Sequence, residues 1–426
     1  HDLPHAHEAL DHEPAVVALR TWTGWLRVAF VLQGVAFAAL VASAGEPGWR
    51  LVRAGVVALI WWGAAVLTGR GPRWRIAVRL VLGAVGAGVG LAFTFSNVDQ
   101  AMGVGGIVGG LGVVLLLSSL GLLGAGAVRG LQRVRLGWRI LFAPVGLVLL
   151  LALWSVVVPA VAATNVGPIP ADDRTPADVG LDFEEIVLRT DDGTLLAAWH
   201  VPTQDGAAVV LLHGAGSTRS DVLDQAEVLA DAGYGLVIPD AAGHGDSEGQ
   251  AMDLGWLGDQ EVEAAVSFLV EEPAVDDERI GVVGLSMGGE QAIGAAASDD
   301  RVQAVVAEGA TGRQVEDKEW YADEYGLRGS LQVGLEWVQT QLTDLLTTSS
   351  PPTPLADGVS DSDVDFLLIS AGTVEDEGQV AERLQAEAPD RVEVWDVPGA
   401  PHVGGLDEDP EGWREQVLTF LDQHLG

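Results

Sequence analysis

The 426-residue sequence predicts an α-helical membrane domain of about five transmembrane helices, followed by an α/β domain with a mainly parallel, eight-stranded sheet. Five long apolar stretches fill residues 22–163, and short β-branched runs alternate with helical patterns after residue 181. Residues 1–167 hold 12 Arg and 6 acidic residues, a net charge of +6, whereas residues 168–426 hold 11 basic and 54 acidic residues, a net charge of −43. The two parts are therefore expected to face different solvents.

The apolar stretches each approach or exceed the roughly 18–20 residues that a helix needs to span a bilayer. They cover approximately residues 26–44, 51–68, 76–96, 102–128 and 140–163. A cleaved signal peptide does not account for five such stretches, and helices that are apolar on every side fit a soluble core poorly. We therefore expect a transmembrane domain at 22–163, after a tail at 1–21. Because no charged residue falls in the middle of a span, an anchor or packing platform is favoured over a transporter.

Arginine is distributed unevenly between the predicted loops. Ten Arg residues precede the first stretch or follow the second and fourth stretches, whereas two lie on the other side. By the positive-inside rule, the N-terminus and the Arg-rich loops face the cytoplasm. Five crossings then place the α/β domain outside the cytoplasm, so we expect a multi-pass protein of the cell membrane.

The composition argues against several partners and chemistries. An acidic chain repels nucleic-acid phosphates and anionic lipid surfaces. The sequence contains no Cys, which excludes disulfides, thiolate nucleophiles and Cys-based metal sites. The tail contains four irregularly spaced His residues, which favours a polar tail over a metal site. The acidic, Lys-poor composition resembles that of proteins from salt-loving microbes; a GC-rich genome is the alternative explanation.

A linker is expected at residues 164–180, which hold three Pro and no apolar periodicity. The following domain, 181–426, alternates predicted strands with predicted helices, which indicates a mainly parallel sheet with helices on both faces. Strands are expected at 185–190, 195–201, 208–212, 235–239, 280–284, 302–307, 366–370 and 392–397, and helices near 221–232, 259–270, 287–297, 379–388 and 410–424. In such sheets the chemistry lies at the carboxyl ends of the strands.

The strongest candidate for a nucleophile is Ser286, in the segment Gly284-Leu-Ser-Met-Gly288. This G-x-S-x-G pattern follows a predicted buried strand and opens a predicted helix. A serine on such a tight turn is exposed above the sheet, and small residues are needed on both sides because a side chain there would collide with neighbouring backbone. The pattern alone is weak in a Gly-rich chain, but its place between a strand and a helix makes it specific.

Two backbone amides are predicted to bind an oxyanion. The segment His213-Gly-Ala-Gly216 follows a predicted strand, so the N–H of Ala215 can join that of Met287, the residue after the nucleophile. An ordinary glycine turn is the alternative interpretation of this segment. The candidate base is His402, on a loop after the last strand, which is where a serine hydrolase on such a sheet needs it.

A further motif makes the resemblance to a known family specific. The segment Asp240–Gly249 reads D-x-x-G-H-G-x-S-x-G and follows the fourth predicted strand. Together with the Ser286 and His213 segments, it resembles lysophospholipase-like and monoglyceride-lipase-like α/β-hydrolases over about residues 183–425. The family often has Arg where this chain has Ala241 or Ala242. The resemblance implies a structural place for His244 near the site.

The acid that orients His402 is expected just after the seventh strand, where three carboxylates are adjacent. We predict Asp376, because Gly372-Thr-Val-Glu-Asp-Glu377 matches a Gly-x-Val-x-Asp-Glu form found in the family, and because a short side chain holds a carboxylate rigidly. Another family form, Gly-x-x-Asp, would instead place the acid at Glu375. Glu375 and Glu377 are expected to be solvated.

A long insertion at about 311–363 separates the sixth and seventh strands, and the resemblance implies a small cap. Its aromatic residues can line an acyl pocket or pack the cap on the body, and the sequence leaves both open; they are Trp320, Tyr321, Tyr325 and Trp337.

The expected reaction is two-step acyl transfer through a Ser-His-Asp triad, without a metal or organic cofactor. Small or lipid-derived carboxylic esters are the expected substrates. The alternatives are a serine peptidase of the prolyl-peptidase type, which shares the fold, and a catalytically silent membrane receptor or assembly platform.

Overall fold

The computed structural model describes residues 24–43, 47–98, 103–167, 169–249, 251, 255–347 and 349–426. The predicted tail at 1–21 lies outside these residues. The chain forms two compact units, of which the first is His1–Gly167 with Gln341–Leu346 and the second is Pro168–Thr340 with Thr347–Gly426.

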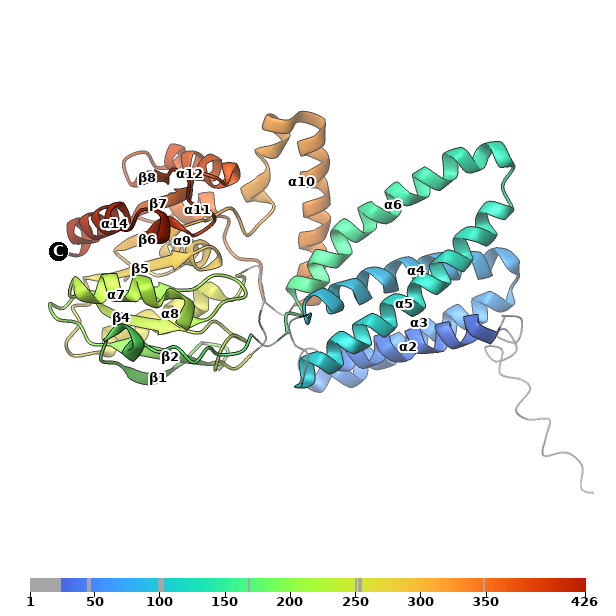
Figure 1. Cartoon of the computed structure of the whole chain (residues 1–426), viewed down its shortest axis with the longest axis horizontal. Coiled ribbons are helices and arrows are strands. Elements are labelled where there is room, and N and C mark those ends of the chain that lie inside the picture. Colours follow the sequence, from blue (N-terminus) through green and yellow to red (C-terminus); the bar gives the residue numbers. More distant parts are fainter. Residues whose placement is uncertain are drawn as a thin grey trace, which may run out of the picture. The chain divides into compact units, whose positions relative to one another are not determined.

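Among its described residues, the first unit contains five helices that are long and apolar enough to cross a membrane. They are α2 (Gly24–Ser43), α3 (Pro47–Gly69), α4 (Pro72–Phe95), α5 (Gly103–Gln132) and α6 (Leu136–Ala163) (Figure 1). Glycine lets α4 and α5 approach closely, since a Cβ added at Gly90 would lie 2.5 Å from the backbone nitrogen of Leu116. Most side chains of α6 are exposed despite being apolar; Leu147 and Leu149, for example, are 56% and 65% exposed. Such a surface fits a hydrocarbon surrounding better than water.

The second unit contains one eight-stranded sheet in the order β1-β2-β4-β3-β5-β6-β7-β8. The strands are β1 (Glu184–Arg189), β2 (Leu195–Val201), β3 (Ala208–Leu212), β4 (Gly235–Pro239), β5 (Ile280–Leu285), β6 (Ala304–Glu308), β7 (Asp365–Ala371) and β8 (Val392–Val397). The pairs β1–β2 and β2–β4 are antiparallel, and all others are parallel. The predicted mainly parallel, eight-stranded sheet is confirmed.

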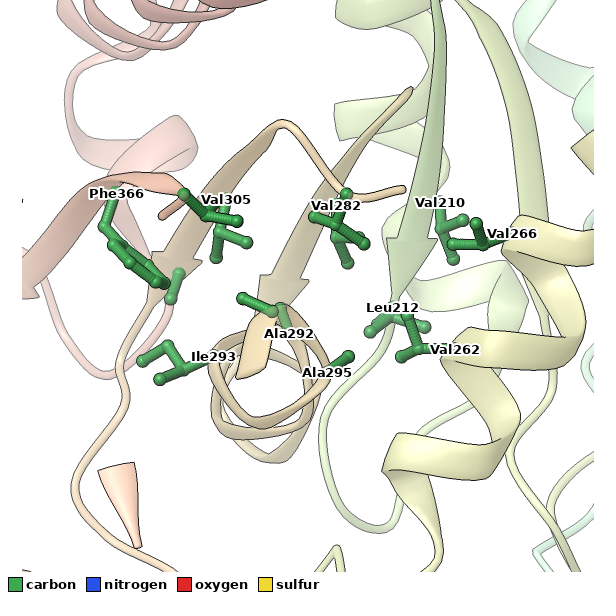
Figure 2. Packing of buried hydrophobic residues seen from close by; sticks show 14 of the residues in the cluster. Val210, Leu212, Val262, Val266, Val282, Ala292, Ile293, Ala295, Val305 and Phe366 are labelled. Atoms are coloured by element: carbon green, nitrogen blue, oxygen red, sulfur yellow. The ribbon is translucent and has the colours of Figure 1, made fainter. Parts of the chain in front are cut away.

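Alternate residues of the central strands point to opposite faces of this sheet, so each strand is buried on both sides. On one face, Val210 and Val282 pack with Val266 of α8 (Gly258–Glu271) and Ala292 of α9 (Met287–Ser298), as Figure 2 shows. Helices α11 (Leu355–Ser360) and α12 (Glu375–Glu387) contribute to the same cluster. On the other face, Val209 and its neighbours pack with α7 (Leu223–Asp231) and α14 (Pro410–Leu425). Helices therefore cover both faces, as predicted.

The insertion between β6 and β7 contains the short helix η3 (Glu316–Lys318), α10 (Tyr321–Leu346) and α11. Helix α10 is interrupted at Gly326, where φ is 56° and ψ is −131°. Asp317 joins the two ends of the insertion, because its carboxylate accepts the backbone N–H groups of Arg313, Gln314 and Leu355 at 3.0, 2.9 and 2.6 Å. The remaining short helices are η1 (Pro176–Val179), η2 (Arg219–Val222) and α13 (Gly405–Glu408).

Candidate active site

The turn between β5 and α9 holds Ser286 in a strained conformation. Its φ is 54° and ψ is −119°, a backbone state that costs a non-glycine residue about 1–3 kcal/mol. The turn is closely packed: a Cβ added at Gly284 would lie 2.2 Å from the carbonyl oxygen of Gly288, and one added at Gly288 would lie 2.7 Å from that of His213. The backbone N–H of Ser286 donates to the carbonyl of Glu308 at 2.7 Å, which ties the turn to the end of β6. The predicted requirement for small residues at 284 and 288 thus has a direct steric cause.

His402 meets Ser286 and a buried carboxylate. Its Nε2 lies 2.8 Å from Ser286 Oγ, and its Nδ1 lies 2.6 Å from Glu377 Oε1. An ionised carboxylate only accepts hydrogen bonds, so Nδ1 carries the hydrogen and Nε2 is free to accept the serine proton. The side chain of His402 is 46% exposed, whereas that of Glu377 is 1% exposed. The hydrogen bond to Glu377 raises the pKa of His402 above 6.5, and the charges of Glu290 and Glu308 act in the same direction.

The structure corrects the predicted acid by one residue. Asp376, which we expected to orient His402, instead accepts a hydrogen bond from the Tyr321 hydroxyl at 3.0 Å. Glu377 occupies the expected place, and its second oxygen accepts the backbone N–H of Ala371 at 2.8 Å. The cause is the start of α12 at Glu375, because successive residues of a helix point about 100° apart. Glu377 falls on the buried side of α12, although it was expected to be solvated. Glu375 is exposed, as predicted.

The two amides predicted to bind an oxyanion lie on segments that pack together beside Ser286. A Cβ added at Gly214 would lie 3.3 Å from Cβ of Ser286, so the loop that carries Ala215 passes close to the nucleophile. The N–H groups of Ala215 and Met287 have no acceptor among the described residues, which leaves both available to a ligand. Two such donors beside a nucleophile are what an oxyanion hole requires, and their role in binding an oxyanion stays a prediction.

His213 holds the same loop in place. Its Nε2 accepts the backbone N–H of Ala241 at 3.0 Å, so its Nδ1 carries the hydrogen and donates to the carbonyl of Gly214 at 2.8 Å. Burial and the neighbouring His244 lower the pKa of His213 to about 4, which keeps the ring neutral at ordinary pH. Sequence reasoning named the segment but not this function of its first residue.

Comparison with known proteins identifies the fold of this unit. Residues 207–407 match the family model described as alpha/beta hydrolase fold. The second unit is an α/β-hydrolase fold domain. Thiohydrolase aneE of Aspergillus aculeatus is 33% identical over 132 residues, and the quorum-quenching protein AidA of Acinetobacter baumannii is 31% identical over 140 residues. These alignments cover 29% and 32% of this chain but only 40% and 44% of the relatives, less than half of each relative's own length.

Matches to solved structures cover somewhat more than half of this chain. An esterase of Pyrococcus furiosus has 25% sequence identity and a TM-score of 0.48, and the match covers 61% of this chain and 97% of the esterase. A dienelactone hydrolase of Anabaena variabilis has 19% identity and a TM-score of 0.42 over 58% of this chain and 99% of that one. The family match and the curated relatives support a hydrolase.

The Asp240–Gly249 segment of the hydrolase domain forms a hydrogen-bonded loop after β4. Asp240 accepts the backbone N–H groups of Arg219 and Asp246 at 2.8 and 3.1 Å, and its carbonyl accepts the hydroxyl of Ser247 at 2.7 Å. His244 is buried, with its ring centroid 5.1 Å from that of His213, and its Nδ1 donates to the carbonyl of Ala242 at 3.1 Å. The structure thus places His244 in the packing of this loop against His213.

Three of the four aromatic residues singled out in the insertion pack on one another. The ring centroids of Trp320, Tyr321 and Tyr325 lie 4.4 to 6.1 Å apart, and Arg383 of α12 lies 4.6 Å from the Trp320 ring. These contacts favour the packing alternative for the three residues. Trp337 is 56% exposed. Within the described residues, no group of three or more His, Asp or Glu side chains is arranged to hold a metal ion.

Proposed function

We propose that this protein is a membrane-anchored serine hydrolase that cleaves carboxylic esters with a Ser286–His402–Glu377 triad. The observation that carries the proposal is the continuous chain of hydrogen bonds from Ser286 Oγ through His402 to the buried Glu377, at 2.8 and 2.6 Å. This arrangement combines an activated nucleophile, a base and a group that fixes the tautomer of the base.

The proposed reaction has two steps. His402 Nε2 takes the proton as Ser286 Oγ attacks the ester carbonyl, and the N–H groups of Ala215 and Met287 stabilise the oxyanion. Collapse of the tetrahedral intermediate breaks the bond to the alcohol, which leaves with the proton from His402. Water then attacks the acyl-enzyme with His402 as the base again, and the acid is released from Ser286. Glu377 stabilises the imidazolium in both steps without taking its proton.

Lipid-derived esters are the substrates that we favour. The Asp240–Gly249 segment resembles that of lysophospholipase-like enzymes, and the same chain carries five helices long and apolar enough to cross a membrane. The uneven distribution of Arg in the predicted loops supports an extracytoplasmic hydrolase domain. Protease added to intact cells is then expected to cut within residues 164–180, whereas cleavage only after lysis would place the hydrolase domain in the cytoplasm.

The test of the chemistry is covalent labelling of the full chain in detergent with a fluorophosphonate, followed by a panel of esters of increasing acyl length. We expect labelling and ester turnover in the wild type and neither in Ser286→Ala. The matched control is Ser298→Ala, at the other end of α9, which should label like the wild type. An unlabelled wild type would favour the silent receptor, and amide cleavage well above ester cleavage would favour the peptidase. Thioesters belong in the panel because one relative is named a thiohydrolase.

A further inference from the structure

Glu308 is a buried carboxylate beside the proposed triad that the reaction itself does not use. It is the last residue of β6 and is 3% exposed. One oxygen accepts the backbone N–H of Gly405 at 2.8 Å, and the other accepts the indole N–H of Trp413 at 3.0 Å. Its backbone carbonyl accepts the N–H of Ser286 at 2.7 Å. One residue therefore holds the nucleophile turn through its backbone and the segment after His402 through its side chain.

The segment that Glu308 holds is conformationally demanding. Val403, the residue after His402, has a φ of 50°, which is rare for a β-branched residue and requires fixed surroundings. Gly309, the residue after Glu308, packs closely against the imidazole ring of His402. A Cβ added at Gly309 would lie 3.0 Å from Cε1 of His402 and 2.9 Å from a methyl carbon of Val403. The imidazole of His402 thus packs directly on the end of β6.

We propose that Glu308 is a positioning residue for His402, holding the His402 loop at the distance at which Nε2 reaches Ser286 and adding a fixed negative charge behind the imidazole. This inference rests on the proposed triad. Burial raises the pKa of Glu308, whereas the hydrogen bonds from Trp413 and Gly405 lower it and favour the ionised carboxylate. The charges of Glu377 from α12, Glu290 from α9 and Glu308 from β6 all favour the protonated form of His402. The charges that act on Glu308 are those of Glu377 and His402.

The test compares kcat, KM and the pH dependence of turnover for the full chain and Glu308→Gln. A neutral glutamine still accepts the N–H of Gly405, but its own NH₂ group then faces the indole N–H of Trp413. We expect kcat to fall roughly ten- to hundredfold, as small displacements of a catalytic group do, with KM little changed. The midpoint of the acidic limb of the pH profile should move to lower pH, because one negative charge near His402 is gone. Fluorophosphonate should still react with Ser286, only more slowly.

A second variant separates position from charge and covers the case in which the single variant does not fold. In Glu308→Gln/Trp413→Phe the conflicting N–H donor is removed, so the loop should return to its place. We expect kcat to recover partly while the acidic limb stays at the lower pH. Asp299→Asn, which changes a buried acid at the far end of α9, is the control and should leave the acidic limb unchanged.

The inference is overturned if both Glu308 variants keep the wild-type kcat and pH midpoint and differ only in thermal stability. Failure of the proposed function would look different, since the wild type itself would then neither label nor turn over ester.

Discussion

Replacement of Glu377 by Gln tests the corrected triad most directly. The two oxygens of Glu377 serve two donors, the Nδ1–H of His402 at 2.6 Å and the backbone N–H of Ala371 at 2.8 Å. A glutamine has one oxygen and one NH₂ group for these two places. If the oxygen stays on Ala371, the NH₂ group faces Nδ1 of His402 and forces the hydrogen onto Nε2. His402 then presents a donor to Ser286 and cannot take its proton.

The opposite orientation of the amide is also unfavourable. The NH₂ group would then face the N–H of Ala371 in a place where the side chain at 377 is 1% exposed. An unpaired buried donor costs about 1–3 kcal/mol, so the resting enzyme favours the wrong tautomer of His402. The imidazolium also loses its charged partner. By analogy with serine proteases, the loss in kcat is on the order of 10⁴, which corresponds to about 5 kcal/mol of transition-state stabilisation.

The adjacent Asp376 supplies the matched control. Asp376→Asn keeps an oxygen that accepts the Tyr321 hydroxyl and does not touch His402, so kcat should stay within a few-fold of the wild type. The assay is steady-state ester hydrolysis by the full chain in detergent, with thermal unfolding measured for each variant to confirm folding. A dead Asp376→Asn with an active Glu377→Gln would refute the geometry and restore the assignment made from the sequence.

Two further predictions concern pH. The acidic limb of kcat/KM should have its midpoint above pH 6.5, because the carboxylates around His402 raise its pKa and the base must be neutral to act; a midpoint below 6.5 would contradict this. Burial raises the pKa of Glu261 from 4.5 to about 7, so the folded protein holds this proton more tightly than the unfolded chain does. The stability linked to this proton is therefore fully present below pH 4.5 and is lost as the pH rises through 7. At pH 8 the ionisation of Glu261 costs about 3 kcal/mol of folding free energy. Glu261→Gln should therefore raise the thermal midpoint by several degrees at pH 8 and hardly at pH 5, whereas equal midpoints for variant and wild type at pH 8 would contradict a raised pKa of Glu261.

The elements that sequence reasoning placed well are those whose signal is local. Central parallel strands are continuous apolar runs bounded by Gly, Pro or charged residues, so their ends differ from the prediction by only a residue or two. Ser286 was found because the steric demands of the turn fix Gly284 and Gly288 around it. His402 followed from chain order once the last strand was placed.

The acid was missed because its position depends on where a helix begins. The helix was predicted from residue 379, whereas α12 begins at Glu375. With the earlier start, Glu377 lies on the same helical face as three buried apolar residues, Val380, Ala381 and Leu384. That periodicity was the available signal, and it indicates a buried carboxylate that needs a partner. The similarity to a family pattern pointed instead to its neighbour.

The other buried acids could not have been identified from the sequence. Residues 168–426 contain 54 acids, and composition alone predicts that nearly all are solvated. Glu308 is buried because tertiary folding brings it to Gly405, 97 residues later in the chain. Only the structure shows that contact, since no local pattern distinguishes Glu308 from the acids around it.

The buried acids set the conditions in which His402 works. Glu377, Glu290 and Glu308 all favour the protonated imidazole. In the resting enzyme their charge opposes catalysis, because a protonated His402 cannot accept the proton of Ser286. In the transition state the same charge helps, since the imidazole has just gained a proton and carries the charge that the carboxylates stabilise. The opposing effect disappears once the solution is alkaline enough to deprotonate the resting His402, whereas the helpful effect remains. A site built this way is therefore suited to turnover on the alkaline side of neutrality.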